Sequence, residues 1–135
     1  MNNTSNTTDA RFERGSARLA EVDGAGGQRV VDALRDVAPD LGRYIVEFAF
    51  GDIYSRPGLS LRDREIATVA ALTALGHAQP QLDVHVNAAL NVGCSAREIM
   101  EVIMQMTLYA GFPAALNAMF TAKKVFAERG LLPVA

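Results

Sequence analysis

The chain has little cysteine and no tryptophan: one Cys and no Trp among 135 residues. A single cysteine excludes an internal disulfide framework and is typical of a reducing compartment, so we expect a cytoplasmic protein. An excess of one charge is also missing, because the formal net charge is only −2. Nothing in this balance favours nucleic acid as a partner.

Long hydrophobic runs are absent as well. No stretch approaches the ~18 uncharged apolar residues that a membrane-spanning helix requires. Residues 1–9 are polar and lack the apolar region of a signal peptide. We therefore expect no membrane association, and residues 1–10 are predicted to form a disordered N-terminal tail.

Strand signals are missing too, whereas helix signals are dense. No sustained alternation of apolar and polar residues is found, while half of the residues are hydrophobic and about a fifth are charged. We predict an all-α fold, with residues 11–135 forming one helical domain of about six to seven short helices. The expected helices lie near 10–21, 27–37, 39–51, 60–75, 80–93, 96–110 and 113–129.

Local signals mark several of these helix ends. Ser95 followed by Glu98 is a capping box, and Cys94 and Ile99 occupy the two positions of a hydrophobic staple. Glycines at 76, 93 and 111 are suited to end helices. The helix that begins at Pro39 is predicted to present one apolar face, made of Leu41, Ile45, Phe48 and Ala49.

The helix expected at 96–110 is apolar on two sides. One face is formed by Ile99, Val102, Ile103, Met106 and Ala110, and a nearly opposite face by Met100, Met104 and Leu108. A helix of this kind needs two packing partners. We expect one of them to be a second subunit, with the Met100–Met104–Leu108 face as the interface; burial of both faces within one chain is the alternative.

Two ionisable residues lie where a packed core should be apolar. Glu65 shares a helix face with Leu61 and Val69, and His85 shares one with apolar neighbours such as Leu82. Buried ionisable groups are costly unless they are paired or used in chemistry. The alternatives are a first-turn carboxylate that reaches solvent and a core histidine that is hydrogen-bonded to a neighbour. On the same helix as His85, a side expected to face water carries Asp83, Asn87 and Asn91.

Familiar cofactor patterns are missing. His77 and His85, with only Asp83 between them, are a poor set of metal ligands, and no Gly-rich phosphate loop is present. Cys94 precedes a helix N-terminus, which could lower its pKa, but the staple explains its position better. We therefore expect no metal and no organic cofactor.

Several segments together resemble one known family. They are Phe-Gly-Asp-Ile-Tyr-Ser-Arg-Pro-Gly-Leu at 50–59, Arg-Asp-Arg-Glu at 62–65, Ala-Leu-Thr-Ala-Leu-Gly at 71–76, Leu-Asp-Val-His-Val-Asn-Ala-Ala-Leu at 82–90, Glu-Ile-Met-Glu-Val-Ile-Met-Gln at 98–105 and Tyr-Ala-Gly-Phe-Pro-Ala-Ala at 109–115. Over roughly residues 11–130, the chain resembles the carboxymuconolactone decarboxylase family, which is itself similar to the alkylhydroperoxidase D proteins.

The resemblance implies an all-α homo-oligomer, commonly a trimer or a hexamer, that acts without a cofactor. The peroxidase-like branch carries Cys-x-x-Cys-x-x-x-His, and with that motif aligned on His85 its cysteine positions fall here on Ala78 and Gln81. Thiol peroxidase chemistry is therefore not expected. The resemblance instead implies a carboxy-lyase of aromatic compound catabolism that acts on a small carboxylated lactone such as 4-carboxymuconolactone.

Within this reading, His85 is the expected proton-transfer group and Glu65 its orienting or proton partner. Arg56 is the expected ligand of a substrate carboxylate, and Tyr109 could donate to a lactone carbonyl. Three alternatives stay open. They are another cofactor-free lyase, isomerase or cyclisation enzyme, a non-catalytic oligomeric binding protein, and redox activity through Cys94 alone.

Overall fold

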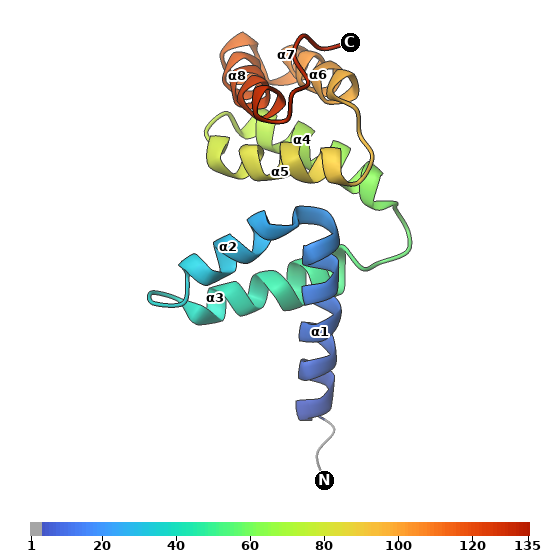
Figure 1. Ribbon diagram of the computed structural model, residues 1–135, viewed down its shortest axis with the longest axis vertical. Coiled ribbons are helices and arrows are strands. Elements are labelled where there is room, and N and C mark those ends of the chain that lie inside the picture. Colours follow the sequence, from blue (N-terminus) through green and yellow to red (C-terminus); the bar gives the residue numbers. More distant parts are fainter. Residues whose placement is uncertain (1–3) are drawn as a thin grey trace. The chain divides into compact units, whose positions relative to one another are not determined.

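All regular elements in residues 4–135, the part of the chain that the computed structural model describes, are helices (Figure 1). The all-α prediction is thus confirmed. The elements are α1 (Thr4–Asp23), α2 (Ala25–Ala33), α3 (Pro39–Tyr44), the π-helix η1 (Ile45–Ile53), α4 (Leu61–Leu75), α5 (Gln79–Asn91), α6 (Ala96–Gln105), α7 (Thr107–Ala110) and α8 (Phe112–Glu128). Within this span, no helix has the length and apolar character needed to cross a bilayer.

The chain divides into two compact units, the first ending at Ser60 and the second spanning residues 61–135. A single domain over 11–135 stays a prediction. Of the predicted tail, residues 1–3 lie outside the described part of the chain, and α1 begins at Thr4.

In the second unit, α4, α5, α6 and α8 surround one apolar core, and α4 and α5 lie side by side (Figure 1). Its largest fully buried apolar side chains are Phe126, Leu82, Ile99 and Ile103. The turn between α4 and α5 begins at Gly76, whose φ of 79° is a conformation that residues with a Cβ rarely adopt. This short turn makes the two helices antiparallel neighbours and brings their facing side chains together.

The capping box before α6 is confirmed. The backbone N–H of Glu98 donates to Oγ of Ser95 at 3.1 Å, and the backbone N–H of Ser95 donates to Oε1 of Glu98 at 3.1 Å. Cys94 and Ile99, the predicted staple pair, are both buried in the core. The predicted helix at 96–110 is divided at Met106 into α6 and α7, with Ile99 and Ile103 buried and Met104 and Leu108 exposed.

In the first unit, α1 packs closely against η1. A Cβ added to Gly15 would lie 1.9 Å from the carbonyl oxygen of Val46, and one added to Gly51 would lie 2.8 Å from the carbonyl oxygen of Arg11. Only a residue without a side chain allows backbones to approach this closely. The two glycines therefore set where the helices cross.

The predicted apolar face of the helix that starts at Pro39 is not the side that the first unit buries. Leu41 and Phe48 are exposed, and the buried side instead contains Gly42, Val46 and Phe50. The apolar pattern gave no weight to Gly42. In the structure, the missing side chain of Gly42 allows the backbone to pack closely. The π-helical turns from Ile45 onward also place more residues in each turn than the 3.6 that the prediction assumed.

Candidate active site

Glu65 and His85 meet directly in the second unit. Oε2 of Glu65 lies 2.9 Å from Nδ1 of His85. The Glu65 side chain, in the second turn of α4, is 0% exposed, and the His85 side chain, in the middle of α5, is 21% exposed. Of the two alternatives for Glu65, burial is therefore the one that the structure shows.

The helix faces explain why this contact forms. Val69 and Thr73 follow Glu65 at intervals of four residues along α4, and all three are buried. On α5, His85 stands beside Leu82 and Val86, which are buried in the same core. The pair therefore lies at the edge of the contact between α4 and α5, with Glu65 buried and His85 partly open to solvent.

One oxygen of the Glu65 carboxylate is left without a match. Oε1 is buried and has no hydrogen-bond partner among the described residues. A buried carboxylate is costly to desolvate, so the contact at Oε2 carries most of its compensation. The imidazole is the group that provides this compensation, most strongly when it carries a proton.

This geometry suits proton transfer. A carboxylate on one ring nitrogen fixes the orientation and tautomer of an imidazole and stabilises its protonated form. Because Nδ1 of His85 is the atom that contacts Glu65, exchange of a proton with a substrate would take place at Nε2.

The polar side of α5 is partly exposed, as the sequence suggested, and it also contacts α8 and the residue that follows it. Asp83 accepts from Lys124 of α8 at 2.8 Å. Arg129 donates to the carbonyl oxygen of Asn87 at 3.1 Å and to the side chain of Asn91 at 3.0 Å. The side chains of Asp83 and Asn91 and the backbone oxygen of Asn87 therefore join α5 to Lys124 of α8 and to Arg129, which follows α8.

Cys94 is a buried thiol. Burial raises its pKa, the nearby Arg62 opposes this, and the carboxylates of Glu65 and Asp63 add to the rise. Since the thiolate is the reactive form of cysteine, this environment disfavours reactivity. Its packing agrees with the structural role expected from the staple.

The structure does not bring every predicted site residue into this pair. Tyr109, on α7, has 76% of its surface exposed and so is not buried with Glu65 and His85. Arg56 belongs to the first unit, where it lies exposed in the segment that follows η1. Their roles stay predictions. In the described part of the chain, no cluster of three or more His, Cys, Asp or Glu residues is placed to hold a metal ion.

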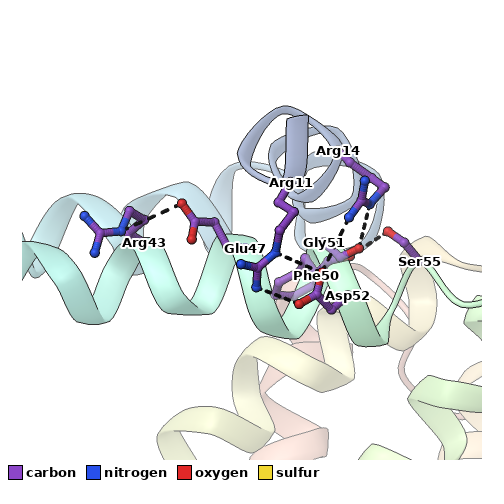
Figure 2. Close-up of polar contacts among 8 residues, drawn as sticks. All are labelled: Arg11, Arg14, Arg43, Glu47, Phe50, Gly51, Asp52 and Ser55. Atoms are coloured by element: carbon purple, nitrogen blue, oxygen red, sulfur yellow. Dashed lines mark hydrogen bonds and ion pairs between the residues drawn. The ribbon is translucent and has the colours of Figure 1, made fainter. Parts of the chain in front are cut away.

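Sequence reasoning missed a polar cluster in the first unit (Figure 2). Nε and Nη2 of Arg11 donate to the two oxygens of Asp52, at 3.2 and 2.6 Å, and Nη2 of Arg14 reaches the same carboxylate at 3.5 Å. The contact with Arg11 lowers the pKa of Asp52. The spacing of three between the arginines, which puts both on one side of α1, is the only local signal for this cluster.

Comparison with known proteins identifies the family of the chain. The model of the carboxymuconolactone decarboxylase family matches residues 39–124. The chain belongs to this family.

Three relatives illustrate its range. A 4-carboxymuconolactone decarboxylase of Acinetobacter baylyi is 36% identical over 126 residues, which cover 93% of each chain. An uncharacterized 15.0 kDa protein from the nqo9–nqo10 intergenic region of Paracoccus denitrificans is 37% identical over 71% of this chain and 72% of the relative. The nitrosuccinic acid decarboxylase npaB of Metarhizium robertsii is 30% identical over 73% of this chain and 71% of the relative.

Proposed function

We propose that this protein is a cofactor-free carboxy-lyase that acts on a small carboxylated lactone or a related carboxylic acid. The observation that carries the proposal is the contact between buried Glu65 and His85. The two relatives named as decarboxylases support the reaction class. Their names differ in substrate, so the class is supported more firmly than any one compound.

In the proposed reaction, the bond between the substrate carboxylate and the adjacent carbon breaks. Its electron pair stays with the rest of the substrate while CO₂ leaves, and the electron-rich fragment then takes a proton from the His85 imidazolium. The Glu65 carboxylate orients the ring and stabilises its protonated form before this step. Solvent returns the proton to His85.

Arg56 and Tyr109 have proposed roles in binding. A guanidinium can hold a carboxylate with two parallel hydrogen bonds, and a phenol can donate to a carbonyl. These roles are supported by side-chain chemistry and by the family resemblance of the segments at 50–59 and 109–115. Thiol peroxidase activity is not proposed, because the buried Cys94 thiol has a raised pKa.

A direct test uses 4-carboxymuconolactone and monitors the release of CO₂, with nitrosuccinic acid as a second substrate. We expect turnover of at least one of them, and we expect His85→Gln to lower it by about 10²-fold or more, the typical contribution of a general acid or base. His77→Gln is the matched control, because His77 is the other histidine of the chain and is exposed. Near-normal turnover by His85→Gln would return His85 to the role of a core histidine.

We also propose that the protein is a homo-oligomer, a trimer or a hexamer. Leu108 is 77% exposed, and Met104 on the same predicted face is exposed too. Further exposed apolar side chains follow on α8, namely Phe112, Leu116 and Phe120. Apolar surface gathered in this way is typical of a protein–protein interface.

Light scattering at micromolar concentration tests this. Met104→Glu should dissociate the assembly, because it places a charge in the proposed interface. Gln105→Glu, which adds the same charge at the neighbouring exposed position, should leave it intact. A stable parent protein with the monomer mass of 14.5 kDa would contradict the proposal.

A further inference from the structure

The end of η1 is held by side chains at consecutive residues. The side chain of Ser55 donates to the carbonyl oxygen of Phe50 at 2.6 Å, and Nε of Arg14 donates to that of Gly51 at 2.8 Å (Figure 2). The carboxylate of the next residue, Asp52, accepts hydrogen bonds from Arg11 and Arg14 of α1. The last carbonyl groups of a helix need hydrogen-bond partners from outside the helix. Here the same contacts also hold residues 50–52, which directly precede the segment that carries Arg56.

The backbone of Arg56 continues directly from this arrangement. The N–H of Tyr54 donates to the carbonyl oxygen of Ala49 at 2.8 Å, which continues the π-helical pattern, and the N–H of Arg56 donates to that of Ile53 at 3.1 Å. In the pattern set by Tyr54, the backbone N–H of Ser55 would bond the carbonyl of Phe50. The hydroxyl of Ser55 donates to that carbonyl, so the group keeps a partner where the chain turns away from the helix.

The closeness of α1 to η1 is what makes this possible. Gly15 and Gly51 allow the two backbones to approach, so that Arg11 and Arg14 reach across at short range. Arg43 of α3 and Glu47 of η1 form a different ion pair, at 3.7 Å (Figure 2). This pair lies away from the C-terminal end of η1. The cluster at residues 50–55 is thus distinct from the general ion pairing of the first unit.

We propose that Arg11, Arg14, Asp52 and Ser55 are positioning residues that preorganise the segment carrying Arg56 for binding a substrate carboxylate. The inference rests on the proposed function, in which Arg56 is the carboxylate ligand. A loop fixed in its binding conformation binds more tightly because less conformational freedom is lost on binding. The cluster therefore acts on substrate affinity, and the proton-transfer step is left to other residues.

The kinetic test compares Ser55→Ala and Asp52→Asn with the unmodified protein, using 4-carboxymuconolactone. We expect KM to rise by about tenfold, the factor that corresponds to ~1.4 kcal/mol, with kcat nearly unchanged. Ser55→Thr keeps the hydroxyl and should restore KM. Arg35→Gln, which removes an exposed ion pair with Asp32 outside the cluster, should leave KM unchanged.

Combining the variants separates positioning from general structural damage. If Ser55 acts through Arg56, then Ser55→Ala should raise KM no further in a protein that already carries Arg56→Ala. Hydrogen exchange gives a readout that needs no activity, since the amides of Tyr54 and Arg56 should exchange faster in Ser55→Ala but not in Arg35→Gln.

The outcomes distinguish the two proposals. No turnover by the unmodified protein would overturn the proposed function, and with it the role of Arg56 as carboxylate ligand. Turnover by the unmodified protein with unchanged KM in Ser55→Ala, or with KM effects that add fully to those of Arg56→Ala, would overturn the positioning role alone. Unchanged exchange of the Tyr54 and Arg56 amides would show that the cluster does not hold the segment.

Discussion

The contact between Glu65 and His85 predicts an asymmetry in protein stability. His85→Ala would leave the fully buried Glu65 carboxylate without its contact at Oε2, while Oε1 already has no hydrogen-bond partner among the described residues. Breaking a buried ion pair in this way costs about 3–5 kcal/mol. Because the His85 side chain is 21% exposed, water can reach the site in the variant, and we expect about 3 kcal/mol.

Glu65→Gln should cost much less. The amide oxygen can still accept a hydrogen bond from Nδ1 of His85, and no charge remains buried. The substitution puts one amide NH₂ group where the unmatched oxygen was. We therefore expect the free energy of unfolding to fall by about 1 kcal/mol or less. The difference between the two variants, about 2 kcal/mol, comes from the charge left behind in one variant and removed in the other.

The double variant makes this reasoning refutable. If the cost of His85→Ala comes from the abandoned carboxylate, then adding Glu65→Gln should recover about 2 kcal/mol of the free energy of unfolding. Urea denaturation at one fixed protein concentration is the assay, because self-association would otherwise shift the apparent stability. Equal losses in both single variants, or a double variant no more stable than His85→Ala, would refute the reasoning.

Three further predictions concern packing, pH and thiol reactivity. Gly15→Ala should lose about 1–3 kcal/mol, because its Cβ would meet a backbone oxygen at 1.9 Å. Gly26→Ala should be neutral or stabilising, because its Cβ would meet only the end of the flexible Arg29 side chain, at 3.7 Å. Equal thermal melting of the two variants would contradict this. The Arg11 contact lowers the pKa of Asp52. The contact should therefore contribute fully to the free energy of unfolding at neutral pH, and this contribution should disappear as the pH falls below about 4. If urea titrations at about pH 2 still show Asp52→Asn to be less stable than the unmodified protein, that would count against this reasoning. Cys94, with a raised pKa and a buried side chain, should react with iodoacetamide far more slowly in the native protein than in urea, and comparable rates would show the thiol to be accessible.

Local features of the fold could be predicted from the sequence because their cause lies within a few residues. The capping box of Ser95 and Glu98 needs only a spacing of three, and both of its hydrogen bonds are present. The glycine stop at Gly76 likewise depends on one backbone conformation. The approximate positions of the helices follow from signals of this kind.

Features that depend on how distant segments meet could not be predicted in the same way. The contact between Arg11 and Asp52 joins residues 41 apart, and the crossing at Gly15 depends on the absence of a side chain. For the candidate pair, the sequence placed Glu65 and His85 on apolar faces, but whether they touch depended on how α4 and α5 align. A contact of 2.9 Å is a tertiary result of that alignment.

The buried polar side chains of the described residues show why the pair stands apart. Thr73 donates to the carbonyl oxygen of Val69 in its own helix at 2.7 Å, so its burial is compensated locally. Glu47 lies 3.7 Å from Arg43, one helical turn away, on a permanently charged partner. Glu65 depends instead on a titratable ring from another helix and leaves one oxygen unmatched. A core built only for stability gains little from such a residue. Buried polar groups with an unmatched atom are concentrated at functional sites, which agrees with the catalytic role that we propose for this pair.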